Sequence, residues 1–250
     1  MQIVVQHFET IDSTNLEAAR QAEQGAVEGT CIVAREQTRG RGRQQRVWLS
    51  PPNAGIYLSL ILRPRIEVSS WPLITLMAAV AVTDTLKDVS GVDADIKWPN
   101  DVLVGDRKIS GILAETVETP FGRAVVLGIG LNLKRDSSLD HLHGIATALN
   151  EVTTFTGAAE DVLATLLKNL DKTYSGLTAD GGAHATLRAW VARSSYAQGK
   201  HVRIVCGPET LEGVTRGLNS DGALKLETTQ GDLRIIHAGD VRAERMKAEG

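Results

Sequence analysis

Arginine is concentrated in one short stretch of this chain, Gly40-Arg41-Gly42-Arg43-Gln44-Gln45-Arg46-Val47-Trp48. Arg35 and Arg39 lie just upstream, and Glu36 is the only acidic residue between Arg35 and Arg46. Guanidinium groups are almost never buried without a partner, and glycine lets the backbone come close to a ligand. We therefore expect a mobile, cationic loop whose chemistry is the binding of an anion.

Charge alone leaves three interpretations of this loop open. The first is a solvated run of charges without a ligand, the second is a nucleic-acid-binding segment rich in arginine and glycine, and the third is a loop that binds phosphate. The low aromatic content of 4% and the absence of an overall basic charge weaken the nucleic-acid interpretation. Trp48 offers a stacking surface for a planar ligand, although a single tryptophan is more often part of a core.

A second cluster, Lys97-Trp98-Pro99-Asn100-Asp101, places a cation, an amide and a carboxylate beside a proline. The proline stops a helix or an inner strand, so Asn100 and Asp101 are expected in a turn at a strand end. An asparagine there can recognise an adenine edge, and an aspartate can orient a cationic or metal partner. The alternative is an Asx turn that satisfies its own backbone.

Two further motifs follow along the chain, Lys108-Ile109-Ser110-Gly111-Ile112-Leu113-Ala114-Glu115 and Gly128-Ile129-Gly130-Leu131-Asn132. Lys108 lies where a hairpin re-enters the sheet, a place where a lysine often only protects a strand edge. Isolated glycines inside a strand indicate a bulge or the close approach of a ligand.

The elements that must position these residues alternate between helices and strands. Ser13–Glu17 predicts a helix start, with Thr14 and Glu17 at capping-box spacing. Hydrophobic periodicity predicts the following further elements: strands at 30–34, 56–62, 95–98, 102–104, 108–117 and 123–133, and helices at 73–89, 162–174 and 184–191.

The pattern changes near Gly199 to short alternating strands at 200–206, 210–218, 223–227 and 233–237, separated by turn signals. We expect an α+β fold with a domain over residues 1–195, in which helices pack on a central mixed sheet. A small SH3-like β-barrel is expected over residues 196–250.

Composition limits the protein class. The chain has 250 residues, 42% of them hydrophobic, with a net charge of −3, so a folded core is expected and general nucleic-acid binding is not. Cys31 and Cys206 both lie in apolar runs and are expected to be free thiols, and no spacing resembles a metal site. Neither a signal peptide nor an apolar run of about 20 residues is present, which favours the cytoplasm.

The motifs above, taken together with Ser13-Thr14-Asn15 and Gln37 in the same order, resemble those of the biotin protein ligases, the biotin–[acetyl-CoA-carboxylase] ligases. The resemblance spans essentially the whole chain, and the ordered set is more specific than any single motif. One departure is Gln45, where the family loop usually has a third glycine.

The resemblance implies an ATP-dependent ligase with a class II synthetase-like catalytic domain. It implies that ATP and Mg²⁺ activate biotin to biotinyl-5′-AMP, and that biotin then passes to a lysine of a biotin carboxyl carrier domain. A carboxylate must approach a triphosphate, so a cationic clamp lowers the repulsion between them.

The resemblance also implies roles for single residues. The catalytic set is Arg41, Arg43, Lys97, Asp101 and Lys108, with Asp101 orienting the incoming amine or Mg²⁺. Biotin is expected at Ser13, Thr14, Asn15, Gln37, Arg41, Gly42, Arg43, Lys108 and Gly111. ATP or the adenylate is expected at Arg43, Arg46, Trp48, Lys97, Asn100 and Asn132, and no residue is assigned as a metal ligand. For Ser13 and Thr14, the residues themselves equally allow a helix cap alone.

Competing functions are a lipoate protein ligase, which uses the same adenylate chemistry, and a nucleic-acid binder. Only 12 residues precede Ser13, so an autonomous DNA-binding domain is not expected. We expect a monomer or homodimer that does not bind a membrane.

Overall fold

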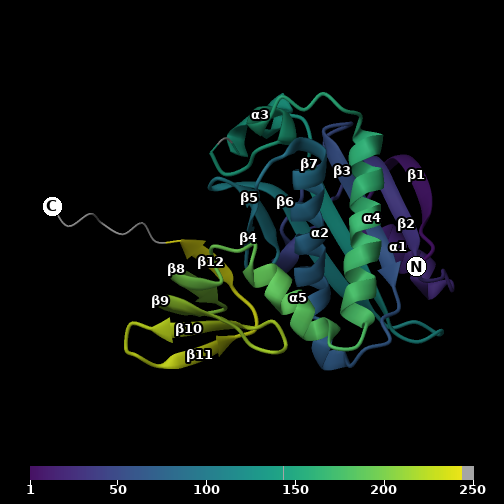
Figure 1. Cartoon of the computed structure of the whole chain (residues 1–250). Helices are drawn as coiled ribbons and strands as arrows, with labels where there is room; N and C mark the ends of the chain where they lie inside the picture. Colours follow the sequence, from purple (N-terminus) through teal and green to yellow (C-terminus); the bar gives the residue numbers. More distant parts are fainter. Residues whose placement is uncertain (143, 244–250) are drawn as a thin grey trace.

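The computed structural model describes residues 1–142 and 144–243 of the chain (Figure 1). The first sheet contains β1 (Val4–Ile11), β2 (Thr30–Gln37), β3 (Gly55–Leu62), β4 (Asp95–Lys97), β5 (Asp101–Val104), β6 (Arg107–Val117) and β7 (Ala124–Asn132). The helices are α1 (Thr14–Glu23), α2 (Leu73–Ser90), α3 (Leu149–Val152), α4 (Ala159–Thr178) and α5 (Gly182–Val191).

The first sheet is mixed, with the strand order β1-β2-β3-β7-β6-β5-β4. β1 runs parallel to β2, and the other neighbouring strands are antiparallel. The sequence patterns gave the other strands to within a few residues but missed β1, whose edge position leaves it with little hydrophobic alternation. The expected α+β fold with a central mixed sheet is confirmed.

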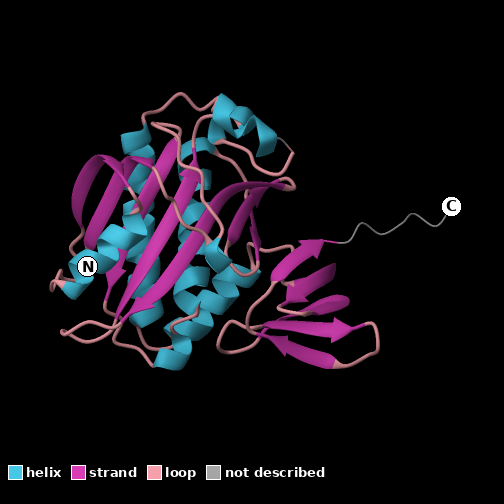
Figure 2. Ribbon diagram, turned by 180° about the vertical axis from the view of Figure 1, so that it is seen from behind, coloured by secondary structure: helices cyan, strands magenta, loops and turns pink. Residues whose placement is uncertain are grey.

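Alternating side chains divide this sheet into two faces. Leu58 and Leu60 of β3 and Ile129 of β7 belong to the main core with α2 and α4. Ile61 and Val126 point the other way and pack with Ala18 and Ala22 of α1. Figure 1 shows α2 and α4 in front of the strands, and Figure 2, from behind, shows the face that α1 only partly covers. The uncovered part of that second face is available for a site.

Helix α2 is the apolar centre of the main core. The segment Val68–Ser90 is long and apolar enough to cross a membrane by length and composition, but 61% of its apolar 18-residue window is buried within the protein. It is the one such segment in the part of the chain that the structure describes. The apolar character of this segment is therefore explained by the packing of α2 in the main core against the first sheet.

The second sheet is antiparallel, with the order β11-β10-β9-β8-β12, and lies beside α5 in Figure 1. Its strands are β8 (Gln198–Cys206), β9 (Glu209–Leu218), β10 (Leu224–Thr228), β11 (Leu233–Ile236) and β12 (Asp240–Ala243). The change to short strands near Gly199 is confirmed, while β12 was missed. The expected range 196–250 extends to residues outside the described part of the chain.

The two sheets are joined by packing and by one buried hydrogen bond. Trp98 Nε1 donates to the carbonyl oxygen of Gly222 at 3.0 Å. A Cβ atom on Gly222 would lie 2.9 Å from Leu76, so this turn is pressed against α2. Trp98 is thus a buried structural residue within a sequence motif whose Lys97, Asn100 and Asp101 are polar.

Both cysteines are free thiols, as expected. Burial raises the pKa of Cys31 to about 12, and Cys206 is half-buried. A buried thiol with a raised pKa is a poor nucleophile, so Cys31 is explained as a small core residue.

Candidate functional site

A cavity of about 140 Å³ opens on the face of the first sheet that α1 leaves uncovered. It gathers residues from the α1 start, the arginine loop, β5, β6 and β7. Its lining includes the expected site residues Ser13, Thr14, Asn15, Gln37, Arg41, Gly42, Arg43, Arg46, Trp48, Asn100, Asp101, Lys108 and Gly111. Segments far apart in the sequence therefore converge on one site.

Glycines form the floor of the cavity. A Cβ atom on Gly128 would lie 1.9 Å from Asn15 Oδ1, and one on Gly130 would lie 2.3 Å from the Trp48 indole. A Cβ on Gly111 would lie 2.8 Å from the same indole. The β3–β7 and β6–β7 registers are continuous, so these glycines mark the close approach of side chains rather than a bulge.

Neutral polar groups line one end of the cavity. Gln37 Oε1 accepts hydrogen bonds from the backbone N–H of Thr14 at 2.8 Å and from the Thr14 hydroxyl at 3.1 Å. Ser59 Oγ lies 2.8 Å from Thr14 Oγ1 and 2.7 Å from Asn15 Oδ1. Gln37 Nε2 donates to Ser50 Oγ at 2.8 Å, which extends the network to the end of the arginine loop.

Ser13 stands at the N-cap position of α1, but its side chain makes no capping hydrogen bond. Its buried hydroxyl has no partner among the described residues, and it lines the cavity. The expected capping box is wrong, because the carboxylate of Glu17 instead pairs with Arg20 at 2.8 Å. A buried hydroxyl without a partner is costly, so Ser13 is suited to bind a ligand.

The arginine loop folds back on itself as a narrow hairpin. Gly42 N donates to the Arg46 carbonyl at 2.7 Å, and Trp48 N donates to the Gly40 carbonyl at 3.0 Å. Gln44 and Gln45 form its tip with φ values of 54° and 61°. Gln45, which replaces the usual glycine, therefore occupies a left-handed conformation that glycine adopts with less strain.

The three arginines of the loop have different partners. Arg41 forms two hydrogen bonds with the carboxylate of Glu115, at 3.0 and 2.8 Å. Arg46 pairs with Asp240 of β12.

Arg43 differs from its neighbours because it donates to a neutral oxygen, Oδ1 of Asn100, at 2.9 Å. Burial lowers the pKa of Arg43 from its usual value, although an arginine remains charged at neutral pH. Among the described residues that line the cavity, Arg43 is the cation without a carboxylate partner. This arrangement leaves its charge available to an anionic ligand.

Asn100 holds Arg43 while being held itself. Its Nδ2 donates to the carbonyl of Ile112 at 2.9 Å, and the Ile112 N–H donates back to its carbonyl at 3.0 Å. Both the oxygen and the nitrogen of the Asn100 side-chain amide therefore have protein partners. Recognition of a nucleotide by Asn100 stays a prediction, whereas its contact with Arg43 is direct.

Asp101 lies between two lysines. One carboxylate oxygen is 2.6 Å from Lys108 Nζ and the other is 3.5 Å from Lys97 Nζ. Lys97, Asp101, Gly111 and Gly130 are paired in one row across four strands. Because Lys97 is at the far end of that row, it contacts Asp101 but does not line the cavity.

Lys108 reaches the cavity because of a register shift between β5 and β6 at Val102 and Leu103. Lys108 and Gly111 are three residues apart, so a regular strand would direct them to opposite faces. The irregularity re-aims the lysine, whose Nζ would lie 2.9 Å from a Cβ on Gly111. The same Nζ lies 5.1 Å from the centre of the Trp48 ring, within cation–π range.

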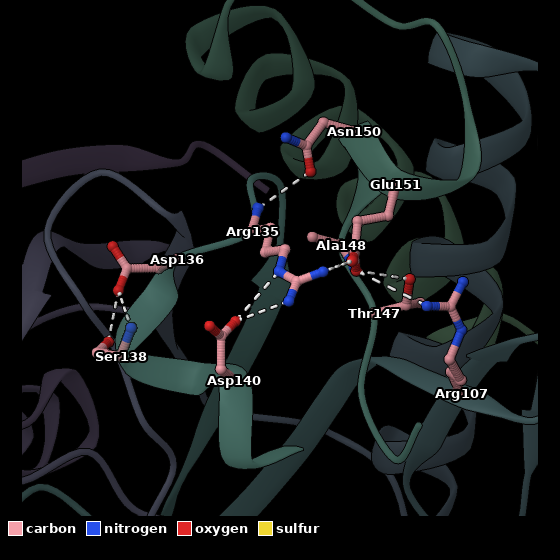
Figure 3. A network of polar contacts seen from close by, with 9 residues as sticks. All are labelled: Arg107, Arg135, Asp136, Ser138, Asp140, Thr147, Ala148, Asn150 and Glu151. Carbon is pink, nitrogen blue, oxygen red and sulfur yellow. Dashed lines mark hydrogen bonds and ion pairs between the residues drawn. The ribbon is translucent and has the colours of Figure 1, made fainter. Parts of the chain in front are cut away.

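Asn132 is the second expected residue outside the cavity. Its Nδ2 donates to the Thr147 carbonyl at 3.0 Å, and it lines a separate cavity with Arg135 and Glu151. Figure 3 shows the polar network there, in which Glu151 accepts from Thr147 and from Arg135. This network holds the segment after β7 against Lys108, whose N–H donates to the Ile145 carbonyl at 2.8 Å.

Three residues of the site were missed in the sequence. Ser59 has the surroundings of an ordinary strand residue, Glu115 ends a motif that predicts a site only at Lys108 and Gly111, and Asp240 lies far along the chain. The signal for Glu115 was its spacing of four from Gly111, which places both on one face of β6. For Asp240 no local signal exists.

The sequence matches two families. Residues 7–132 match the Biotin/lipoate A/B protein ligase family, and residues 198–242 match the Biotin protein ligase C terminal domain. The chain is similar to the bifunctional ligase/repressor BirA of Bacillus spizizenii, with 37% identity over 96% of this chain and 75% of that protein. It shares 34% identity with the biotin–[acetyl-CoA-carboxylase] ligase of Paracoccus denitrificans, over 92% of this chain and 96% of that protein.

A solved structure is also similar to the fold described above. The biotin protein ligase from Aquifex aeolicus in complex with biotin and ATP has 26% sequence identity and a TM-score of 0.83. The similarity covers 97% of this chain and 99% of that one.

Proposed function

This chain belongs to the biotin protein ligases, and we propose that the cavity on β6 and β7 is where it joins biotin to ATP. A biotin carboxylate oxygen attacks the α-phosphorus of ATP, which forms biotinyl-5′-AMP and releases pyrophosphate. A lysine amine of a biotin carboxyl carrier protein then attacks the acyl carbon, giving an amide and AMP. The enzyme is thus an ATP-dependent ligase.

The observation that carries this assignment is the polarity of the cavity. One end offers neutral groups, including the unpartnered hydroxyl of Ser13, and the other end offers the cations Arg43 and Lys108. Biotin has a neutral ureido ring at one end and a carboxylate at the other. The cavity therefore accepts biotin in one orientation, with its carboxylate toward the phosphates.

We assign the ureido ring to Ser13, Thr14, Asn15 and Gln37 at the neutral end. The backbone of Arg41, Gly42 and Arg43 then covers the ligand, and Gly111 provides space beside Lys108. Lys108 contacts the biotin carboxylate and lowers its repulsion with the phosphates. The hydrogen bonds that join Thr14 to Gln37 keep these groups in place before the ligand arrives.

The nucleotide is assigned to the cationic end. Arg43 faces the phosphates, Trp48 covers the adenine, and Asn100 acts by holding Arg43, while Arg46 is a phosphate ligand only after it rearranges. Arg46 must leave Asp240 to contact a phosphate. Lys97 acts through Asp101, while Asn132 serves the nucleotide only if the segment after β7 rearranges.

Mg²⁺ is expected to enter with ATP, where it would neutralise phosphate charge. No group of three or more histidine, cysteine, aspartate or glutamate side chains forms a metal site within the described residues. Mg²⁺ bound to phosphates needs only one or two protein carboxylates, and Asp101 and Asp240 line the cavity. These two residues would hold the ion.

Replacing Asp101 by alanine is expected to slow transfer to the carrier far more than it weakens biotin binding. Of the two carboxylates that line the cavity, Asp101 is the one that we propose orients the incoming amine, and it also contacts Lys108. Single-turnover transfer from preformed adenylate and equilibrium binding of biotin measure the two effects separately. An unchanged transfer rate would refute the role of Asp101.

Protease cleavage near Arg39–Arg46 is expected to be suppressed by biotin together with ATP. An acyl-adenylate hydrolyses when water reaches it, so the hairpin closes over the intermediate. Limited trypsin digestion with and without both ligands, followed by mass spectrometry, measures this closure. Equal cleavage under the two conditions would count against it.

The function is tested by biotin-dependent exchange of labelled pyrophosphate into ATP. Exchange with biotin and not with lipoate is the expected result, because the neutral polar end fits a ureido ring and not a long acyl chain. A folded protein that shows no exchange contradicts adenylation at this cavity, and exchange with lipoate alone would favour lipoate ligation.

We further propose a division into a catalytic domain over 1–195 and an SH3-like domain from 196 onward, supported by the start of β8 at Gln198. A cytoplasmic location, a monomeric or homodimeric state, no membrane binding and no autonomous DNA binding are also proposed. Cell fractionation, sedimentation and a gel-shift titration test these expectations.

A further inference from the structure

The carboxylate of Glu115 lies where three separate segments of the chain meet. Its two oxygens accept from Arg41 Nη1 at 3.0 Å and Arg41 Nη2 at 2.8 Å. Oε2 also accepts from Asn15 Nδ2 at 3.1 Å. One side chain of β6 therefore connects the arginine loop to the start of α1.

The ion pair with Arg41 has the geometry of a strong contact. Two parallel hydrogen bonds between guanidinium and carboxylate combine charge with a defined orientation. The Arg41 and Glu115 side chains are 41% and 31% exposed, so solvent screens the pair only in part. Because its charge is neutralised by Glu115, Arg41 is a poor phosphate ligand beside Arg43.

Asn15 anchors the Glu115 side of this ion pair through hydrogen bonds. Its Oδ1 accepts from Ser59 Oγ at 2.7 Å, while its Nδ2 also lies 3.4 Å from the Leu113 carbonyl. The absence of a side chain at Gly128 leaves the space that Asn15 fills. Glu115 is thus anchored to the sheet and to the helix start, and Arg41 is the mobile partner.

We infer that Glu115 is a positioning residue that holds the arginine loop closed over the biotin end of the cavity. Arg41 acts through this ion pair, as the latch of the hairpin, and its side chain is not one of the cations that act on the phosphates. The inference rests on the proposed function and assigns a role to Glu115 that the sequence motifs did not.

Replacing Glu115 by glutamine removes the charge but keeps the size and an oxygen for Asn15. The KM for biotin in pyrophosphate exchange is expected to rise about tenfold, the loss typical of a partly exposed charge-assisted contact. The kcat at saturating biotin changes little, because the ligand closes the loop once bound. Without ligands, trypsin is expected to cleave the hairpin faster than in the unmodified protein.

Glu9→Gln is the matched control. Glu9 pairs with Arg35 at 3.1 Å on the exposed edge of the same sheet, and neither residue lines the cavity. This variant is expected to keep the KM for biotin and the cleavage rate. Arg41→Met and the double variant with Glu115→Gln complete a cycle, in which the two effects should not add.

Two results would contradict the proposal that Glu115 holds the arginine loop closed. One is an unchanged biotin KM and cleavage rate in Glu115→Gln, and the other is a large loss of kcat in Arg41→Met that Glu115→Gln does not share. If the unmodified protein shows no exchange, the proposed function fails, but the ligand-free cleavage rates still decide whether the latch exists. Thermal unfolding of each variant identifies any that does not fold.

Discussion

Replacing Lys108 by glutamine is expected to slow biotin-dependent pyrophosphate exchange about 10²–10³-fold, the usual loss when a group that stabilises transition-state charge is removed. The ammonium of Lys108 lies 2.6 Å from Asp101 and reaches over Gly111 into the cavity. Without it, the biotin carboxylate and the α-phosphate approach each other with less compensating charge. The measurement is kcat at saturating biotin and ATP.

Lys87→Gln provides the comparison for this variant. Lys87 Nζ is 2.8 Å from Asp93 at the exposed end of α2, so the same type of ion pair is removed at a place remote from the cavity. Its exchange rate should match that of the unmodified protein. A loss of less than about tenfold in Lys108→Gln, equivalent to about 1.4 kcal/mol, would show that Lys108 does not act on the reacting groups.

Replacing Gly130 by alanine is expected to raise the KM for ATP by about 10- to 100-fold, since overpacking commonly costs about 1–3 kcal/mol. The new methyl group would lie 2.3 Å from the Trp48 indole, which has to move away from the sheet. Trp48 is the proposed cover for adenine, so its displacement affects the nucleotide directly. Steady-state kinetics with varied ATP measure the effect.

Gly176→Ala is the matched glycine substitution. Apart from its chain neighbours and its own helix backbone, no atom lies within 4 Å of its Cβ position, and the residue is inside α4, where alanine is favoured over glycine by about 0.5–1 kcal/mol. This control should keep the KM for ATP and unfold at a slightly higher temperature. An unchanged KM in Gly130→Ala would mean that Trp48 does not border the nucleotide.

The residues that line the candidate cavity were largely predictable because most of them belong to short local motifs, while their roles stay predictions. Ser13, Gln37 and Lys108 were all expected, and the structure brings them to one cavity. Strands such as β3 were predictable because their hydrophobic runs are long and end at turn residues. The edge strand β1 lacks that signal.

The partners of the site residues were not predictable, because they depend on register and on distant contacts. The position of Lys108 depends on a strand irregularity that a sequence does not display. The contact between Arg46 and Asp240 joins residues separated by most of the chain. A capping box was expected at Glu17, but Glu17 pairs with Arg20 within the same helix, and Ser13 makes no capping bond.

The turn that carries Gly222 has a consequence for unfolding. Gly222 meets Trp98 and α2, and Val202 and Leu224 belong to the same hydrophobic core as Leu73. Because the two sheets share this core, unfolding of either sheet would expose apolar surface on the other. The free energies of unfolding of the two sheets are therefore coupled. Melting should therefore proceed as one cooperative transition, and the fragment 1–195 should be metastable and prone to aggregation when produced alone.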